Sequence, residues 1–301
     1  MKKKLYTLAV AMVAGLTVAN AQQDMMLTQE MFSRINKNPA GTGNAGTIDA
    51  FLHGRYQWAG VDNSPKSFVL NVVDYEEKIK SGIGLSVGYD NFGVGHSNTN
   101  PKLCYSYQLD LNSKTVLSLG LAAGANFGYF NFAENTIEEN IQYEEQLFEK
   151  DKDTKITPDF DLGFELSQLY WTLGASVTHL TNNDGETQVA PRHFYVYGTG
   201  LIPVNARFDL APTVAYMHRN KTDVMEVGTM VFYNRLMWGG VAWRPDIHNG
   251  CNPSTLALTL GLEWKKFRFG YSFDMGLGSE NQLPSNTHEI ILSASFDKKK
   301  K

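Results

Sequence analysis

The stretch Ile290-Ile291-Leu292-Ser293-Ala294-Ser295-Phe296, near the end of this 301-residue chain, decides the fold. Successive side chains of an extended strand point to opposite faces. One face of this strand is apolar and carries Ile290, Leu292, Ala294 and Phe296. The other face is polar except at Ile291, and it carries Glu289, Ser293 and Ser295. A last strand with one apolar face and a terminal Phe is typical of outer-membrane β-barrels, whose outer face meets lipid.

The same alternation recurs along most of the chain. The clearest examples are residues 83–90, 159–167, 256–264 and 267–274. Together with the turn residues between such stretches, the pattern predicts about fourteen strands. A soluble β-sandwich alternates as well. Here, however, the apolar face is aromatic at strand ends and the polar face carries charge and glycine, which favours a barrel in a membrane.

The lengths of the connections also favour a closed antiparallel transmembrane barrel. Short connections are expected at 76–81, 110–114, 168–169, 204–205, 234–235 and 265–266. The intervening connections are expected to be mostly longer, near 59–65, 93–99, 131–157, 181–191, 219–223, 246–253 and 275–286. Outer-membrane barrels join their strands by short periplasmic turns and longer extracellular loops. An even number of strands would return Phe296 to the periplasm, where the first strand begins.

The beginning of the chain has the pattern of a secretory signal. Lys2, Lys3 and Lys4 precede a short apolar stretch, and Ala19-Asn20-Ala21 forms a small-residue cleavage site. We therefore expect a signal peptide at 1–21, a pre-barrel segment at 22–45, the barrel at 46–296 and a lysine-rich tail at 297–301. No other stretch approaches the ~20 apolar residues that a membrane helix needs.

Three features allow more than one interpretation. The segment 22–45 lacks a clean strand period, so it could cap the periplasmic mouth, enter the lumen or pair with a partner. The segment 131–157 holds six Glu and two Asp against three Lys, which predicts a solvated extracellular loop. The charges expected in the lumen either fill it as paired side chains or line a selective channel. They include Asp90, Asp159, Asp161, Glu165, Arg268 and Asp274.

No motif predicts an enzyme, a cofactor site or a metal site. The seven histidines are scattered without metal-ligand spacing, and the Gly-x-Ser-x-Gly motif of esterases is absent. A hydrolase site assembled from distant residues stays open as an alternative. The formal net charge of −4 argues against nucleic-acid binding, which needs a basic stripe. Cys104 and Cys251 are interpreted as isolated residues, or as a disulfide in an oxidising compartment.

Several short motifs follow one another in order along the chain. They are Gln23-Asp24, Thr28-Gln29-Glu30-Met31-Phe32, Asn38-Pro39-Ala40-Gly41, Arg55-Tyr56-Gln57-Trp58-Ala59-Gly60 with Ser64-Pro65, Gly82-Ile83-Gly84 with Asp90-Asn91-Phe92-Gly93, Gly270-Tyr271-Ser272-Phe273-Asp274, and Ser285-Asn286-Thr287-His288-Glu289-Ile290. Their order and spacing resemble the PorP/SprF family of type IX secretion system outer-membrane proteins, from about residue 23 to 296. Met25 and Glu30 depart from the family pattern, which has a Pro and an aromatic residue there.

The resemblance implies an integral, non-enzymatic outer-membrane barrel that works with the type IX secretion and gliding machinery. Its implied partners are components of that apparatus and exported proteins with C-terminal sorting domains, which it would anchor or hand on. The alternative is an outer-membrane channel for small molecules. The candidate partner-contact residues lie in the N-terminal motifs and in the acidic loop; they are Phe32, Asn38, Pro39, Glu138, Glu139, Glu144 and Glu145.

Overall fold

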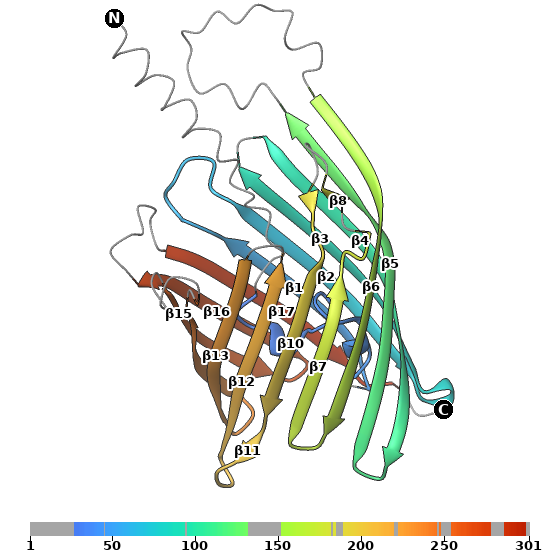
Figure 1. Ribbon diagram of the computed structural model, residues 1–301. Helices are drawn as coiled ribbons and strands as arrows, with labels where there is room; N and C mark the ends of the chain where they lie inside the picture. Colours follow the sequence, from blue (N-terminus) through green and yellow to red (C-terminus); the bar gives the residue numbers. More distant parts are fainter. Residues whose placement is uncertain are drawn as a thin grey trace, which may run out of the picture.

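The chain folds into a closed antiparallel barrel of fourteen strands (Figure 1). The computed structural model describes residues 27–44, 46–93, 95–131, 152–181, 183–184, 189–219, 222–245, 247, 254–277 and 286–298. The barrel strands are β1 (Ile48–Tyr56), β2 (Lys66–Glu76), β3 (Ser81–Gly93), β4 (His96–Asn112), β5 (Thr115–Asn131), β6 (Lys152–Gln168), β7 (Trp171–Thr178), β10 (His193–Gly200), β12 (Phe208–Arg219), β13 (Thr222–Tyr233), β14 (Met237–Pro245), β15 (Ser254–Trp264), β16 (Phe267–Leu277) and β17 (Asn286–Phe296).

Neighbouring strands pair in sequence order, and two pairings close the ring. The last strand pairs with the first, with Phe296 opposite Ile48. On the far side β10 pairs directly with β12, while the short strand β11 (Ile202–Pro203) adds to β12 as an extra strand. A separate ribbon of β8 (Asn183–Asp184) and β9 (Val189–Ala190) lies between β7 and β10 in the chain. The prediction of about fourteen strands is therefore confirmed.

The apolar and polar faces of the strands lie as the alternation predicts. Side chains of the apolar face point outward, and Leu103 and Leu260 are among the most exposed, at 68% and 62%. Outward exposure of large apolar side chains is the arrangement that lipid requires. In β17, Ile290 and Leu292 point outward, whereas Ile291 is completely buried on the lumen side. Ile291, the one residue that breaks the alternation of residues 290–296, is thus an apolar residue inside the barrel.

The two ends of the barrel differ in their connections. At one end lie the short connections 77–80, 113–114, 169–170, 201–207, 234–236 and 265–266, together with the start of β1 and the end of β17. We assign this end to the periplasm and the other end to the cell exterior. Two connections expected to be long, near 93–99 and 219–223, are short instead. The reason is that the strands are longer than expected. Strand β4 already begins at His96, β12 ends only at Arg219, and β13 begins at Thr222.

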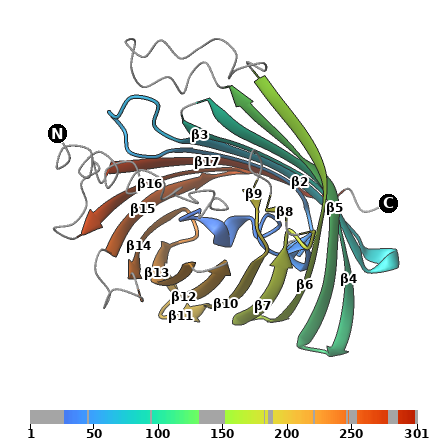
Figure 2. The same cartoon turned by 45° about the horizontal axis from the view of Figure 1, so that its top comes forward.

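Helical structure is confined to three short 3₁₀ turns, η1 (Glu30–Phe32), η2 (Pro39–Gly41) and η3 (Glu77–Ile79), in the part of the chain that the structure describes. None of the described helices is long and apolar enough to cross a membrane. The first two belong to residues 27–44, which we call the luminal segment. Figure 2 shows this blue segment inside the ring of strands. Of the three places considered for it, the structure shows the lumen.

Candidate functional site

The luminal segment crosses the interior of the barrel from one wall to the other. Its first residues contact β14, β16 and β17, and its later residues contact β4, β5 and β6. Its course runs from Thr28, which bonds the extracellular halves of β16 and β17, to Thr42 and Asn44 at the periplasmic ends of β3 and β4. The candidate site is therefore the filled lumen.

Thr28 is bound by a charged cluster on the first wall. Its backbone N–H donates to Glu289 Oε2 at 2.9 Å and its hydroxyl to Asp274 Oδ1 at 3.0 Å. Arg244 donates to the Thr28 hydroxyl at 2.8 Å and to Asp274 Oδ2 at 2.9 Å. Arg55 adds a second guanidinium, 3.0 Å from Asp274 Oδ2. Buried carboxylates of this kind need such partners, since an unpaired buried charge is costly.

Phe32, a predicted contact residue, packs into an aromatic group inside the barrel. Its ring centroid lies 4.9 Å from that of Trp238 and 6.4 Å from that of Phe232. The Arg268 guanidinium lies over the same ring, 4.7 Å from its centroid, in cation–π geometry. Ile291 belongs to the core cluster against which Phe32 packs. The exception in the last strand is thus explained by the luminal segment.

Arg34 links the luminal segment to the opposite wall through an ion pair. Its guanidinium binds Glu165 of β6 in bidentate fashion, with Nε to Oε2 at 2.8 Å and Nη2 to Oε1 at 3.0 Å. Tyr197 of β10 donates to the same carboxylate at 2.6 Å. Arg34 is therefore a permanent cation bound to a fully buried carboxylate.

Asn38 and Pro39, two further predicted contact residues, are buried between the luminal segment and β5 and β6. Asn38 caps η2 by accepting from Ala40 N at 2.9 Å, and Pro39 occupies the first position of that turn. The Asn38 amide also donates to Phe164 O and to the Tyr197 hydroxyl, each at 3.0 Å. The Asn-Pro-Ala-Gly motif is therefore a capped turn docked on the wall.

Two glycines of the wall make room for this turn. An added Cβ at Gly163 would overlap the Asn38 side chain, and one at Gly120 would overlap the backbone of Pro39 and Ala40. Glycine is the residue that allows such close approach of another segment. The glycines on the polar face of β5 and β6 are thus part of the docking surface for the luminal segment.

A second charged cluster lies on β4, on β6 and just after the end of β7. Asp159, Asp161 and His179 place ligand-type atoms within 4.8 Å of one another. The ammonium group of Lys102 lies between the two carboxylates, 3.0 Å from Asp159 and 2.8 Å from Asp161. His179 is 2.6 Å from Asp159 through Nδ1. The lysine supplies the positive charge that these carboxylates need.

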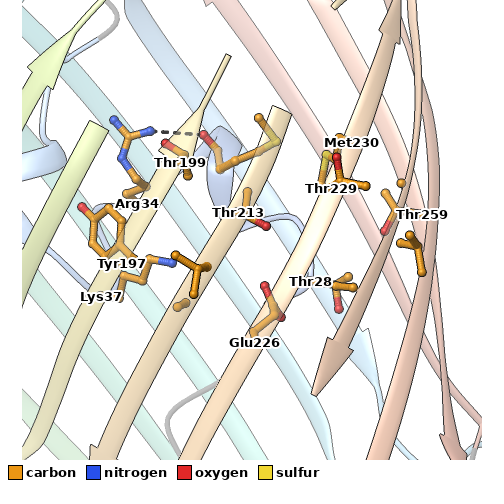
Figure 3. A pocket seen from close by; sticks show the side chains of 16 residues that line it. Thr28, Arg34, Lys37, Tyr197, Thr199, Thr213, Glu226, Thr229, Met230 and Thr259 are labelled. Atoms are coloured by element: carbon orange, nitrogen blue, oxygen red, sulfur yellow. Dashed lines mark hydrogen bonds between the residues drawn. The ribbon is translucent and has the colours of Figure 1, made fainter. Parts of the chain in front are cut away.

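On the side of β10, β12, β13 and β14 the luminal segment lies close to the wall. A cavity of about 40 Å³ remains there, between Arg34 and Lys37 of the segment and Thr213, Glu226 and Thr229 of the strands (Figure 3). Lys37 lies over the Tyr197 ring at 4.7 Å. A space of this size holds about one or two water molecules.

The predicted contact residues are thus only partly described. Phe32, Asn38 and Pro39 come together in the luminal segment, where their described contacts are with the barrel itself. Glu138, Glu139, Glu144 and Glu145 lie outside the described residues, as does Cys251; Cys104 is a free, buried thiol packed near Ile35.

Sequence reasoning missed Thr28 and Arg34 as docking residues. The apolar residues at lumen positions, such as Phe51, Trp238 and Ile291, indicate a lumen that is filled by protein, because the wall of a water-filled lumen is polar.

The fold and the filled lumen define a transmembrane β-barrel of the outer-membrane type, closed upon a segment of its own chain. The chain belongs to the family of the type IX secretion system membrane protein PorP/SprF, whose model matches residues 19–294. The predicted family and location in the outer membrane are thereby confirmed.

Two solved structures show the fold of this chain at low identity. The CymD monoaromatic hydrocarbon channel has 12% identity and a TM-score of 0.54, covering 91% of this chain and 94% of its own. A FadL homologue of Pseudomonas aeruginosa has 12% identity and a TM-score of 0.51, covering 86% of this chain and 92% of its own. No curated protein matches the chain. The structural likeness concerns the fold alone.

Proposed function

We propose that this barrel is a non-enzymatic component of the type IX secretion and gliding system that anchors exported surface proteins or hands them on. Its proposed partners are exported proteins with C-terminal sorting domains and other components of the apparatus. The observation that supports this over a small-molecule channel is the luminal segment, bonded to both walls through Thr28 and Arg34. A channel needs a continuous aqueous path, and here protein occupies the lumen.

The chemistry of the contacts argues that the segment is a permanent part of the barrel. Glu165 is completely buried, and its cationic partner Arg34 belongs to the luminal segment, so withdrawal of the segment would leave a buried charge uncompensated. Breaking such a pair by losing one partner costs about 3–5 kcal/mol. Repeated withdrawal of the segment for each passing solute would incur this cost at β6, and it would also break the hydrogen bonds of Thr28 at the other wall.

The acidic loop offers the outer contact in this proposal. Glu138, Glu139, Glu144 and Glu145 lie in the connection between β5 and β6, at the end assigned to the exterior. A basic surface on an exported protein would complement them. Phe32, Asn38 and Pro39 would contribute by fixing the luminal segment, and a partner would reach them only if that segment moved.

Deletion of the gene tests the proposal. We expect one or a few exported proteins to be lost from the cell surface, measured by surface proteolysis and mass spectrometry, while uptake of small solutes stays unchanged. Normal display of all exported proteins, combined with slower uptake of a small solute, would contradict the anchor and support a channel.

A further inference from the structure

A larger cavity lies on the other side of the luminal segment, at the periplasmic end of the lumen. It measures about 340 Å³ and lies between the segment and strands β1, β2, β16 and β17. Asp49 and Ser295, which line it, are next to the first residue of β1 and the last residue of β17. Since those strand ends lie at the periplasmic end, the cavity is closer to the periplasm than to the exterior. Ligand sites commonly have volumes of about 300–1,000 Å³.

Part of the wall of this cavity is a row of residues across four neighbouring strands. Asn71 of β2 is opposite Phe51 of β1, Phe51 is opposite Ser293 of β17, and Ser293 is opposite Arg268 of β16. All four line the cavity. The row thus presents an amide, an aromatic ring, a hydroxyl and a guanidinium side by side.

Two polar atoms of this row have no hydrogen-bond partner among the described residues. Asn71 is 1% exposed, and its amide donates to the Ser33 hydroxyl at 2.8 Å while Oδ1 is left without a donor. Ser293 Oγ is likewise buried and unpaired. Whichever way the Asn71 amide is turned, one of its polar atoms lacks a partner. A buried polar atom without a protein partner calls for one, such as a water molecule or a ligand, and here two of them lie in the same row of one cavity.

Arg268 gives the cavity its charge preference. Its Nε and Nη2 atoms donate to Glu263 Oε2, at 3.2 and 2.9 Å, and its plane lies over the Phe32 ring. A guanidinium has five N–H donors in a planar fork, so this pair leaves donors for a second carboxylate. Met31, Phe32, Ile35 and Val73 supply apolar surface around the row.

From this arrangement we infer that the cavity binds the carboxylate end of an extended peptide entering from the periplasm. The main chain of a peptide carries both a donor for Asn71 Oδ1 and an acceptor for the Ser293 hydroxyl. The terminal carboxylate pairs with Arg268, and an apolar side chain packs on Phe51 and Phe32. This inference rests on the proposed function, because the peptide is then a segment of an exported protein or of the apparatus.

The test uses two defined probes, N-acetyl-valyl-phenylalanine and its C-terminal amide. Binding of each to the full-length purified barrel is measured by isothermal titration calorimetry. We expect the acid to bind and the amide to bind about tenfold more weakly, because only the acid offers a charge-assisted pair. Failure of the acid to bind, or equal affinity for both probes, would overturn the inference.

Variants place the binding in this cavity. Arg268→Gln is expected to remove the preference for the acid, and Ser293→Leu to weaken binding strongly, because it removes the unpaired hydroxyl and places a bulky apolar side chain in the cavity. Thr229→Val is the matched control, since Thr229 is also a buried, unpaired hydroxyl but lines the opposite wall. Heat-modifiable migration on gels verifies that each variant is a folded barrel. Unchanged binding to a folded Ser293→Leu barrel would overturn the inference.

The outcome for this cavity is separable from the proposed function. If gene deletion abolishes surface display but the acid probe does not bind, the secretion role stands and the peptide site is wrong. If the probe binds as expected but deletion leaves display normal, the peptide site stands and the secretion role is wrong.

Discussion

Arg34 and Glu165, which are 131 residues apart in the sequence, form a bidentate ion pair inside the barrel, with N–O distances of 2.8 and 3.0 Å. Glu165 is completely buried, whereas the Arg34 side chain is 19% exposed. The pair joins the luminal segment to β6. It therefore couples the position of the N-terminal part of the chain to the wall.

The first prediction is that Arg34→Met loosens the luminal segment more than Glu165→Gln does. Arg34→Met leaves a buried carboxylate unpaired, at a cost of about 3–5 kcal/mol, whereas Glu165→Gln leaves a partly exposed guanidinium. Cys104 reports the loosening, since its buried thiol packs near Ile35 of the segment. In a Cys251→Ser background, maleimide labelling of Cys104 should accelerate roughly a hundredfold in Arg34→Met.

The double variant Arg34→Met/Glu165→Gln is the control for this pair. It should label more slowly than Arg34→Met alone, because the uncompensated charge is gone. Labelling of the double variant at a rate equal to the product of the two single effects would show that the two residues act independently.

The second prediction concerns the close approach at Gly163. Gly163→Ala places a methyl group on the Asn38 side chain, so it should displace the capped turn and speed Cys104 labelling. Gly88→Ala is the matched control on β3, where an added Cβ meets nothing within 4 Å. Equal labelling rates for the two alanine variants would mean that the turn is not docked on Gly163.

The third prediction concerns the lipid face. Leu258 points outward at 44% exposure, so Leu258→Arg should impair insertion, at a cost of about 2–4 kcal/mol near the membrane midplane. Gly88→Arg, with open space beside it, should insert normally. The yield of heat-modifiable barrel in outer-membrane fractions measures both. Full insertion of Leu258→Arg would contradict the assignment of this face.

The fourth prediction concerns the acidic loop. Replacing Glu138, Glu139, Glu144 and Glu145 with Ser should reduce crosslinking of an exported protein to the barrel from outside. The reduction should be smaller when wild type and variant are compared at high salt, because salt screens exposed charges. The variant should assemble normally. Undiminished crosslinking at low salt would remove this loop from the proposed binding site.

The sequence predicts the barrel well because lipid imposes a period of two on every strand, as in the outward Leu residues of β15. It does not predict the path of the luminal segment. That path depends on pairs remote in sequence, such as Thr28 with Asp274 and Arg34 with Glu165. Local pattern carries no information on such pairs. The sequence shows the apolar Ile291 in the lumen face of the last strand, but Phe32, which packs against the cluster that contains Ile291, lies at the other end of the chain.

Single-channel conductance of the purified barrel in a planar bilayer tests most directly whether the luminal segment closes the lumen. If the luminal segment is a permanent part of the structure, the wild-type barrel should show no stable open pore. Arg34→Met should show opening events, because it removes the pairing partner of Glu165. Large, stable wild-type pores that Arg34→Met leaves unchanged would contradict the account and identify the protein as a channel.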